Sequence, residues 1–310
     1  MPIQSATVVG AGAMGGIFGA QLARSGVQTT FLDVSQPLVD HIRSEGLTIV
    51  RGDDEEAVEV NATADPAELA PSDLVIVFVK CFHTEDAVRR AAPAIGPDTT
   101  VLSLQNGWGN GETISRLVSP EQLVLGVTYV SGTVVGRGRI GWTGAGPTYI
   151  GEYTANGKDL AAPAADALTE AGFTVTVADN VRQEIWNKLS LNAATLPTAA
   201  LTGLTAGALA GTAPMYDLVD AVAREAIAVA RASGYDLDEA ATIERIHTVL
   251  AGAGDGKASM LQDVEAGRRT EVDVITGAVL RGGKEHGVPT PINEALYALI
   301  TGLESARGLA

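Results

Sequence analysis

Residues 7–15 read TVVGAGAMG, a short β-branched run followed by the spacing Gly-x-Gly-x-x-Gly. Gly10 permits a tight turn after the strand, Gly12 lets the backbone approach a pyrophosphate, and Gly15 lets the following helix lie close to the strand. The N-terminus of that helix offers free N–H groups and a positive dipole end to the anion. The stretch therefore predicts a dinucleotide-binding turn. The predicted cofactor contacts in it are Gly10, Gly12, Ala13, Met14 and Gly15.

Asp33 bears on which dinucleotide binds, because it directly follows the second β-prone run, residues 29–32. A carboxylate at this place can accept hydrogen bonds from the adenosine ribose and repels a 2′-phosphate. No basic residue follows before Arg43, whereas an NADP site favours Arg or Lys beside the ribose. The sequence therefore favours NAD, with NADP as the alternative. Asp33 is also compatible with a simple solvated strand-end residue.

The first half of the chain alternates short apolar runs with amphipathic stretches. Strands are expected at 6–9, 29–32, 74–79, 100–104 and 123–128, and helices at 15–25, 36–44, 84–94 and 112–118. This rhythm predicts a mainly parallel sheet with helices on both faces. Glycine-rich breaks within 132–153 favour a hairpin or an antiparallel edge, and a further helix and strand are expected at 161–171 and 174–178.

The second half loses the strand pattern from about Asn180. Four stretches with apolar residues at three- and four-residue spacing predict long helices, at 183–192, 215–233, 237–251 and 273–286. The predicted fold is an α/β Rossmann-type doubly wound N-terminal domain, residues 1–179, followed by an all-α C-terminal domain, residues 180–310. Ligand pockets commonly form between domains, so the active site is expected in the cleft between these two.

Charge and composition argue against several classes of protein. The 310 residues carry a formal net charge of −16 and no Lys/Arg cluster, which disfavours nucleic acid as a partner. Glycine, proline or charge interrupts the apolar stretches well short of the roughly 20 residues that span a bilayer, so no membrane helix is expected. The one cysteine, Cys81, cannot form an intrachain disulfide, and no charged-then-apolar leader follows Met1. We therefore expect a cytoplasmic protein.

Metal binding and assembly leave weaker traces in the sequence. The four histidines show no metal-ligand spacing with one another or with Cys81, so no bound metal is expected. Residues 215–233 are long and apolar enough to pack against a second subunit as well as their own domain. A homodimer is therefore compatible with the sequence.

Lys188 and Asn192 lie four positions apart in the first predicted helix of the second half. This spacing puts both side chains on one helix face, where an ammonium and an amide can clamp a carbonyl group. Hydride attack on a ketone creates alkoxide charge. An ammonium whose pKa burial lowers toward neutrality can stabilise that charge and deliver the proton. Taken alone, a lysine on a helix is more often a solvated surface residue.

A second cluster lies around a Gly-Arg-Arg-Thr-Glu break at residues 267–271, where two helix-compatible segments meet. Ser259, before the break, is a candidate donor to a substrate carboxylate. Glu271, at its end, can orient the lysine or accept from a substrate hydroxyl. The alternatives are a helix cap for Ser259 and an acidic residue at a helix N-terminus for Glu271.

Two polar motifs follow predicted strands of the first half. Lys80 comes directly after the strand at 74–79, and Asn106 follows the strand at 100–104 within Gln-Asn-Gly. The carboxyl ends of strands form the edge at which doubly wound sheets bind ligands. We therefore expect Lys80 and Asn106 near the cofactor, and Asn106 near the reacting carbonyl as well. Asn106-Gly107 is equally typical of a turn with no other role.

Together these motifs resemble those of the ketopantoate reductase family over nearly the whole chain. The resemblance is carried by residues 10–15, 79–80, 105–107, 186–188 with Asn192, and Ser259 with 270–273. In that family a Rossmann domain is joined to an all-helical domain, and the enzyme reduces 2-dehydropantoate to D-pantoate, normally with NADPH. The resemblance implies that Lys188 is the general acid and Glu271 its partner. It also implies that Asn192 and Ser259 bind substrate and that Asn106 contacts the cofactor and the active site.

Three positions depart from the pattern of the pantoate-forming members. Leu196 stands where they have a second asparagine, Gly256 where an asparagine precedes the serine by three residues, and Asp33 where they have a basic residue. The same fold family includes NAD-dependent D-2-hydroxyacid dehydrogenases of the D-mandelate type. Their substrates carry a bulky apolar group, which Leu196 would suit.

The sequence thus predicts an NAD(P)-dependent reductase of a small 2-oxo acid, either ketopantoate or a bulkier apolar 2-oxo acid. The alternative from another class is a catalytically silent dinucleotide-binding regulatory protein. The presence of Lys188 together with Glu271 argues against this alternative.

Overall fold

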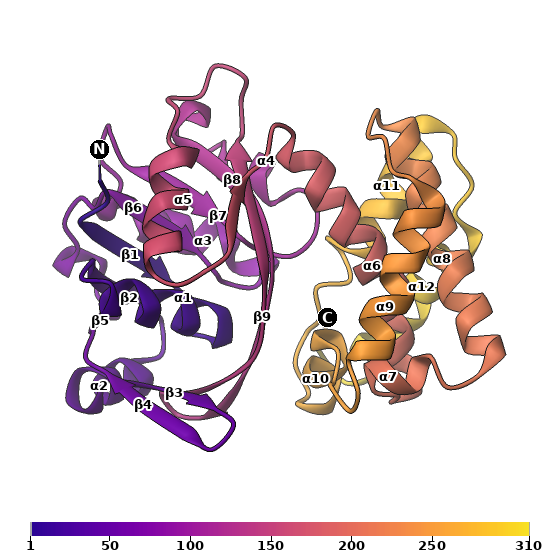
Figure 1. Cartoon of the computed structure of the whole chain (residues 1–310), viewed down its shortest axis with the longest axis horizontal. Helices are drawn as coiled ribbons and strands as arrows, with labels where there is room; N and C mark the ends of the chain where they lie inside the picture. The colour runs from indigo at the N-terminus through magenta and orange to yellow at the C-terminus, as the bar shows by residue number, and fades with distance from the viewer. Residues whose placement is uncertain (1, 310) are drawn as a thin grey trace. The chain divides into compact units, whose positions relative to one another are not determined.

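The computed structural model describes residues 2–309 (Figure 1). The chain forms two compact units, the first made of Met1–Gln105 and Asn110–Val181, the second of Asn106–Gly109 and Arg182–Ala310. The main division falls after Val181, close to the sequence-based boundary at residue 179. The four residues 106–109 belong to the second unit although they lie between two elements of the first. No sequence pattern predicted that these four residues pack with the second unit.

The first unit is built on one ten-stranded sheet, whose strand order is β4-β3-β9-β8-β7-β6-β1-β2-β5, with β10 paired to β9. Its strands are β1 Ser5–Val9, β2 Gln28–Leu32, β3 Leu47–Arg51, β4 Asp54–Val58, β5 Asn61–Thr63, β6 Leu74–Val77, β7 Thr100–Ser103, β8 Leu123–Gly136, β9 Arg139–Glu152 and β10 Val175–Val177. All pairings are parallel except β3 with β4 and β8 with β9. The central strand β1 lies between β2 and β6, so the glycine turn that follows it lies at the carboxyl edge of the sheet.

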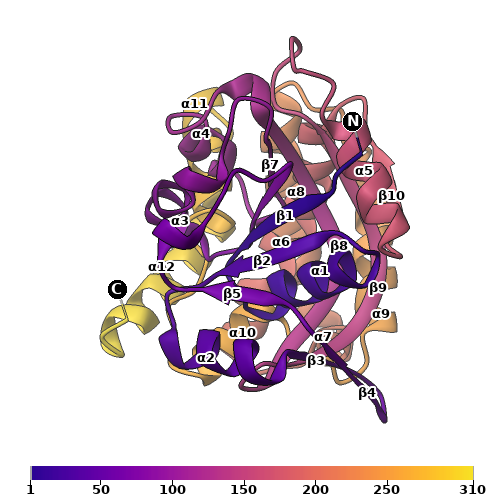
Figure 2. The ribbon, with the colours of Figure 1, turned by 90° about the vertical axis from the view of Figure 1, so that its left-hand side faces the viewer.

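Helices flank this sheet, as the Rossmann-type prediction requires (Figure 2). They are α1 Ala13–Arg24, α2 Gln36–Glu45, α3 Thr84–Arg90, α4 Asn110–Ile114 and α5 Ala161–Glu170, with short 3₁₀ turns at Pro66–Glu68, Cys81–His83, Ala92–Ala94 and Pro120–Gln122. Helix α1 packs against β2, β8 and β9, and the Phe18 ring on it stacks on Phe173 at 4.1 Å. The predicted α/β Rossmann-type fold is confirmed.

Three short strands of the first unit, β3, β4 and β5, were not predicted. Strand β4 reads DEEAV and is exposed at its first four residues, so no apolar alternation marks it. It is a strand because its backbone pairs antiparallel with β3, from Arg51 opposite Asp54 to Leu47 opposite Val58. The predicted hairpin is present as β8 and β9, but β9 is not an edge because β3 pairs with its other side. Helix α4 is shorter than the predicted 112–118.

Among its described residues the second unit consists of helices and connecting loops, with no strand. Its helices are α6 Val181–Thr202, α7 Ala206–Leu209, α8 Ala213–Ala232, α9 Glu239–Gly252, α10 Ser259–Glu265, α11 Thr276–His286 and α12 Pro291–Ala306. Helices α8, α11 and α12 pack against one another, and the apolar face of α8, including Val219, Val222 and Ala226, is buried within the unit. Helix α12, which was not predicted, follows Thr290 and has Pro291 at its first position, as is typical of a helix start. None of the described helices is long and apolar enough to cross a membrane.

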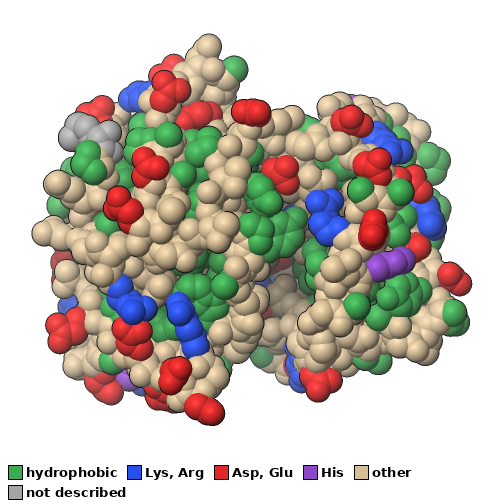
Figure 3. All heavy atoms as spheres, viewed as in Figure 1, with side chains coloured by type: hydrophobic (Ala, Val, Ile, Leu, Met, Phe, Trp, Pro, Cys, Tyr) green, Lys and Arg blue, Asp and Glu red, His purple; other side chains and the backbone are tan. Residues whose placement is uncertain are grey.

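The surface reflects the acidic composition. On the face shown in Figure 3, Asp and Glu side chains are spread over both units, with Lys and Arg side chains among them. The exposed arginines take part in ion pairs such as Arg139 with Glu55 and Arg224 with Glu239. Pairs of this exposure contribute little to stability. They do balance part of the negative charge.

Candidate active site

The glycine turn between β1 and α1 has the geometry that its sequence requires. Gly10 has φ +98°, which side chains rarely adopt, and Gly12 is the N-cap residue of α1. A Cβ on Gly15 would lie 1.9 Å from the Gly10 carbonyl oxygen, so helix and turn touch there. A Cβ on Gly12 would meet nothing within 4 Å. The backbone at Gly12 is therefore open to a ligand, next to free N–H groups of a twelve-residue helix.

Asp33 holds this turn to the end of β2. Its Oδ2 accepts the Ala11 N–H at 2.8 Å and its Oδ1 accepts the Ser35 N–H at 2.9 Å. Carboxylate oxygens have two lone pairs each, so both retain capacity for ribose hydroxyls. Asp33 thus holds the turn, a structural role that the sequence did not reveal, and its contact with the ribose stays a prediction. Gly10, Gly12, Gly15 and Asp33 fit the pyrophosphate and ribose of a nicotinamide dinucleotide.

Gln105 joins the two strand-end loops that follow β6 and β7. Its Nε2 donates to the Val79 carbonyl at 2.7 Å and to the Thr84 hydroxyl at 2.8 Å, and its Oε1 accepts from the Ser103 hydroxyl. Lys80, partly buried, begins the 3₁₀ turn Cys81–His83 in the first of these loops. Gln105 belongs to the Gln-Asn-Gly motif, in which the sequence predicts a role only for Asn106. Its position directly after a strand was the available signal.

Asn106, the next residue, contacts the lysine of the second unit's first helix. Lys188 Nζ donates to Asn106 Oδ1 at 2.9 Å, and both residues belong to the second unit. Burial lowers the pKa of Lys188 from 10.5 to about 8, and the negative charge of Glu271 opposes this shift. A lysine with this pKa can give up a proton near neutral pH, which a solvated lysine cannot. Lys188 is therefore not the solvated surface lysine that was the alternative interpretation.

Glu271 lies in the loop before α11 and is 7% exposed. Its carbonyl oxygen accepts from the N–H groups of Val274 and Ile275, which closes the loop into a turn. The preceding residue, Thr270, donates its N–H at 2.6 Å to the buried carboxylate of Glu304 on α12. Helix α12 thus holds the loop that carries Glu271 through Glu304, a residue that no sequence pattern singled out.

Asn192 and Leu196 continue the face of α6 one and two turns beyond Lys188. Both are largely buried, at 7% and 8% exposure. Within the described chain the Asn192 side chain forms no hydrogen bond to protein, which leaves a nearly buried amide for a ligand. Leu196 thus places an apolar side chain one turn beyond Asn192.

Ser259 is exposed at the first residue of α10, and the N-cap residue is Ala258. The cap that had been the alternative for Ser259 is not formed. Among the described residues no hydrogen bond joins Ser259 to Lys188 or Glu271. The structure thus gathers Lys188, Asn106 and Glu271, with Asn192 one turn away, and leaves Ser259 outside that cluster.

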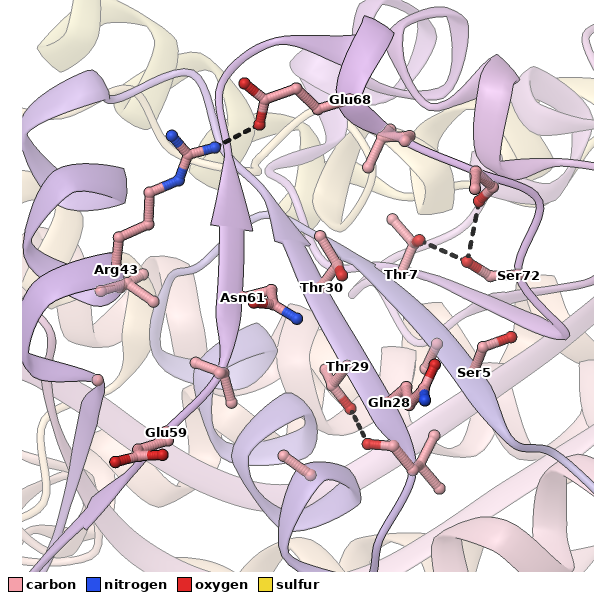
Figure 4. Close-up of a pocket in the computed structure, with 18 of the residues that line it drawn as sticks. Ser5, Thr7, Gln28, Thr29, Thr30, Arg43, Glu59, Asn61, Glu68 and Ser72 are labelled. Atoms are coloured by element: carbon pink, nitrogen blue, oxygen red, sulfur yellow. Dashed lines mark hydrogen bonds and ion pairs between the residues drawn. The ribbon is translucent and has the colours of Figure 1, made fainter.

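A groove of about 1060 Å³ lies elsewhere in the first unit, at the amino ends of the strands (Figure 4). Some of its polar side chains come from three neighbouring strands, namely Ser5 and Thr7 on β1, Gln28 and Thr30 on β2, and Asn61 on β5. An ion pair between Arg43 and Glu68 lies at its rim. None of the predicted site residues lines this groove. Among the described residues there is also no group of three His, Cys, Asp or Glu suited to a metal ion.

Similar proteins are consistent with these features. The curated 2-dehydropantoate 2-reductase of Archaeoglobus fulgidus is 30% identical over 305 residues, which cover 98% of this chain and 99% of the relative. That of Halobacterium salinarum is 30% identical over 297 residues, covering 94% and 96%.

Solved structures agree along the whole chain. A ternary structure of D-mandelate dehydrogenase with NADH and anilino(oxo)acetate has a TM-score of 0.93 at 27% identity, covering 99% of this chain and 100% of that one. A PanE/ApbA family ketopantoate reductase from Ralstonia eutropha JMP134 has a TM-score of 0.86 at 32% identity, covering 98% and 99%.

Family models account for both units. Residues 6–155 match the model for ketopantoate reductase PanE/ApbA, and residues 180–304 match the model for its C-terminal part. These two matches span most of the chain. The resemblance seen in the motifs is thereby confirmed, and the chain belongs to the ketopantoate reductase family.

Proposed function

We propose that this protein uses NADH to reduce a 2-oxo acid bearing a bulky apolar group to the corresponding D-2-hydroxy acid. The reaction class itself, nicotinamide-dependent reduction of a 2-oxo acid, follows from family membership and agrees with the sequence-based prediction. The observation that carries the proposal is the hydrogen bond from Lys188 to Asn106, made by a lysine whose pKa is about 8.

The proposed chemistry uses Lys188 as the general acid. When bound, the reduced nicotinamide supplies the hydride that the carbonyl carbon accepts. Lys188 donates a proton from Nζ to the carbonyl oxygen, which becomes the hydroxyl, and the neutral amine regains its proton from water. Asn106 orients the ammonium through its Oδ1, and Glu271 favours the charged form of the lysine.

Asn192 and Ser259 are proposed to bind the substrate. The Asn192 amide lies on the same helix face as Lys188 and is nearly buried, which suits a hydrogen bond to the 2-oxo acid. Ser259 is exposed and makes no cap, so its hydroxyl remains available for a substrate carboxylate.

The proposed preference for NADH depends on Asp33. Its carboxylate accepts the Ala11 N–H of the dinucleotide turn, so its negative charge lies beside that turn. A 2′-phosphate placed there would be repelled, whereas ribose hydroxyls can donate to the carboxylate. The similar D-mandelate dehydrogenase structure contains NADH, which supports the same preference. Lys80 and Asn106 are proposed as further cofactor contacts.

Leu196 supports the bulky apolar substrate. It replaces an amide by an apolar side chain one turn beyond Asn192 and is 8% exposed. Ketopantoate remains the second candidate, because the curated relatives at 30% identity are 2-dehydropantoate 2-reductases.

A spectrophotometric screen tests the proposal. Oxidation of NADH and of NADPH would be followed with benzoylformate, 2-oxoisovalerate and ketopantoate. We expect the highest kcat/KM with NADH and benzoylformate. A preference for ketopantoate with NADPH would overturn the substrate and cofactor proposals but retain the enzyme class. Dinucleotide binding without turnover of any 2-oxo acid would support the silent regulatory protein instead.

A further inference from the structure

Residues Asn106–Gly109 connect β7 to α4 in the first unit, yet they belong to the second unit. Two backbone features attach them there. The Trp108 N–H donates to the Val274 carbonyl at 2.8 Å, and Gly107 has φ +88°. A Cβ on Gly107 would lie 2.5 Å from the Val274 carbonyl oxygen. The segment therefore touches the loop that carries Glu271, at a distance that only glycine allows.

The side chain of Trp108 provides a third attachment. Its ring lies 5.4 Å from the ring of Trp186 and 5.6 Å from that of Tyr235, and these two rings are 6.0 Å apart. Trp186 is 2% exposed and lies on α6, two residues before Lys188, while Tyr235 follows α8. Three aromatic rings from three parts of the second unit thus form one cluster. Pairs at these distances stabilise each other beyond simple area burial.

This cluster connects the residues of the proposed site. Trp108 lies two residues after Asn106, and Trp186, which the Trp108 ring contacts, lies two residues before Lys188. The hydrogen bond from Lys188 Nζ to Asn106 Oδ1 therefore lies beside a rigid aromatic contact that joins the same two segments. Within the described chain the Trp108 indole N–H makes no hydrogen bond, so the ring acts through contact.

We propose that Trp108 is a positioning residue: its ring, packed against Trp186 and Tyr235, holds Asn106 where its Oδ1 meets the ammonium of Lys188. The proposal rests on the function proposed above and deepens it. In this proposed role the Trp108 side chain touches neither the substrate nor the reacting atoms. It acts through Asn106, whose displacement by even 1 Å would weaken proton transfer.

The test compares Trp108→Ala with Trp108→Phe. Removing the ring should lower kcat roughly 10- to 100-fold. Because the displaced Asn106 then no longer accepts from the ammonium, the pKa of Lys188 should fall below about 8. Phenylalanine keeps an aromatic contact and should restore most of the rate. Trp142→Phe, in the first unit against Phe173, is the matched control and should resemble the wild type.

A second measurement separates this inference from the proposed function. Acetylation of the five lysines by acetic anhydride, followed against pH by peptide mass spectrometry, gives the titration of Lys188 without any substrate. A lowered titration point in Trp108→Ala supports the inference even if no 2-oxo acid is turned over. Wild-type titration and kcat in Trp108→Ala would overturn it. So would equal losses in both Trp108 variants that parallel their loss of thermal stability, since that result indicates packing alone.

Discussion

Lys188 and Asn106 are joined by a hydrogen bond of 2.9 Å although 82 positions separate them in the chain. The bond brings the first helix of the second unit together with a segment that follows strand β7 of the first. It pairs an ammonium of lowered pKa with an acceptor that fixes its direction.

Replacing Lys188 by alanine removes the proposed general acid. We expect turnover of the 2-oxo acid to fall about 10²- to 10⁴-fold, while the affinity for NADH stays nearly the same. Steady-state kinetics and a fluorescence titration with NADH measure the two quantities. Lys284→Ala, an exposed lysine on α11, is the control and should keep full activity. An unaffected rate in Lys188→Ala would remove this residue from the mechanism.

The reduction should depend on pH through Lys188. Its pKa is about 8, so the ammonium is present below that pH and is lost above it. The kcat/KM for reduction should therefore fall about tenfold per pH unit above 8, and the reverse oxidation should rise over the same range. A rate of reduction that stays level from pH 7 to 10 would contradict the assignment.

Glu271→Gln should move the alkaline fall in kcat/KM for reduction to lower pH. The charge of Glu271 raises the pKa of Lys188, whereas burial lowers it. Removing that charge should therefore lower the pKa of Lys188 further. The pH dependence of kcat/KM in the variant measures the displacement. Glu265→Gln serves as the control, since that exposed carboxylate pairs with Lys257. If kcat/KM fell at a higher pH in Glu271→Gln, or shifted equally in both variants, the role given to Glu271 would be refuted.

Two alanine substitutions in the dinucleotide turn should have opposite consequences. Gly12→Ala adds a methyl group in open space, so thermal stability should be kept while NADH binding is lost or strongly weakened. Gly15→Ala puts a Cβ 1.9 Å from the Gly10 carbonyl, so the protein itself should be destabilised. Thermal unfolding and NADH titration of both variants give the comparison. Normal NADH affinity in Gly12→Ala would place the cofactor elsewhere.

Asp33→Asn should relax the choice of cofactor. Asparagine keeps one oxygen acceptor for the turn but removes the charge that repels a 2′-phosphate. The ratio of kcat/KM for NADPH over NADH should rise roughly tenfold or more. Asp40→Asn, an exposed carboxylate on α2, should leave the ratio unchanged. If both variants behave like the wild type, Asp33 only holds the turn.

Leu196→Asn should shift the choice of substrate. An amide one turn beyond Asn192 offers a polar contact to ketopantoate and removes apolar surface from a bulky side group. The ratio of kcat/KM for ketopantoate over benzoylformate should rise, while Leu196→Met should keep the wild-type ratio. No change in this ratio would mean that Leu196 does not face the substrate.

Local sequence patterns determined much of this protein. The glycine spacing at residues 10–15 and the alternation of strands and helices predicted the Rossmann-type unit, because backbone geometry and side-chain period are local properties. The spacing of Lys188 and Asn192 likewise placed them on one face of α6. Strand β4 escaped prediction because its residues are exposed and acidic, and only pairing with β3 makes it a strand.

Tertiary structure alone decided how the candidate site is assembled. No pattern in Asn106–Gly109 shows that these four residues leave their own sheet unit for the helical one, because contacts over such separations depend on packing. The same holds for Gln105 between two loops and for Glu304 behind Thr270. A lysine motif can be recognised in sequence, but its lowered pKa comes from burial and a neighbouring charge, which only the folded chain provides.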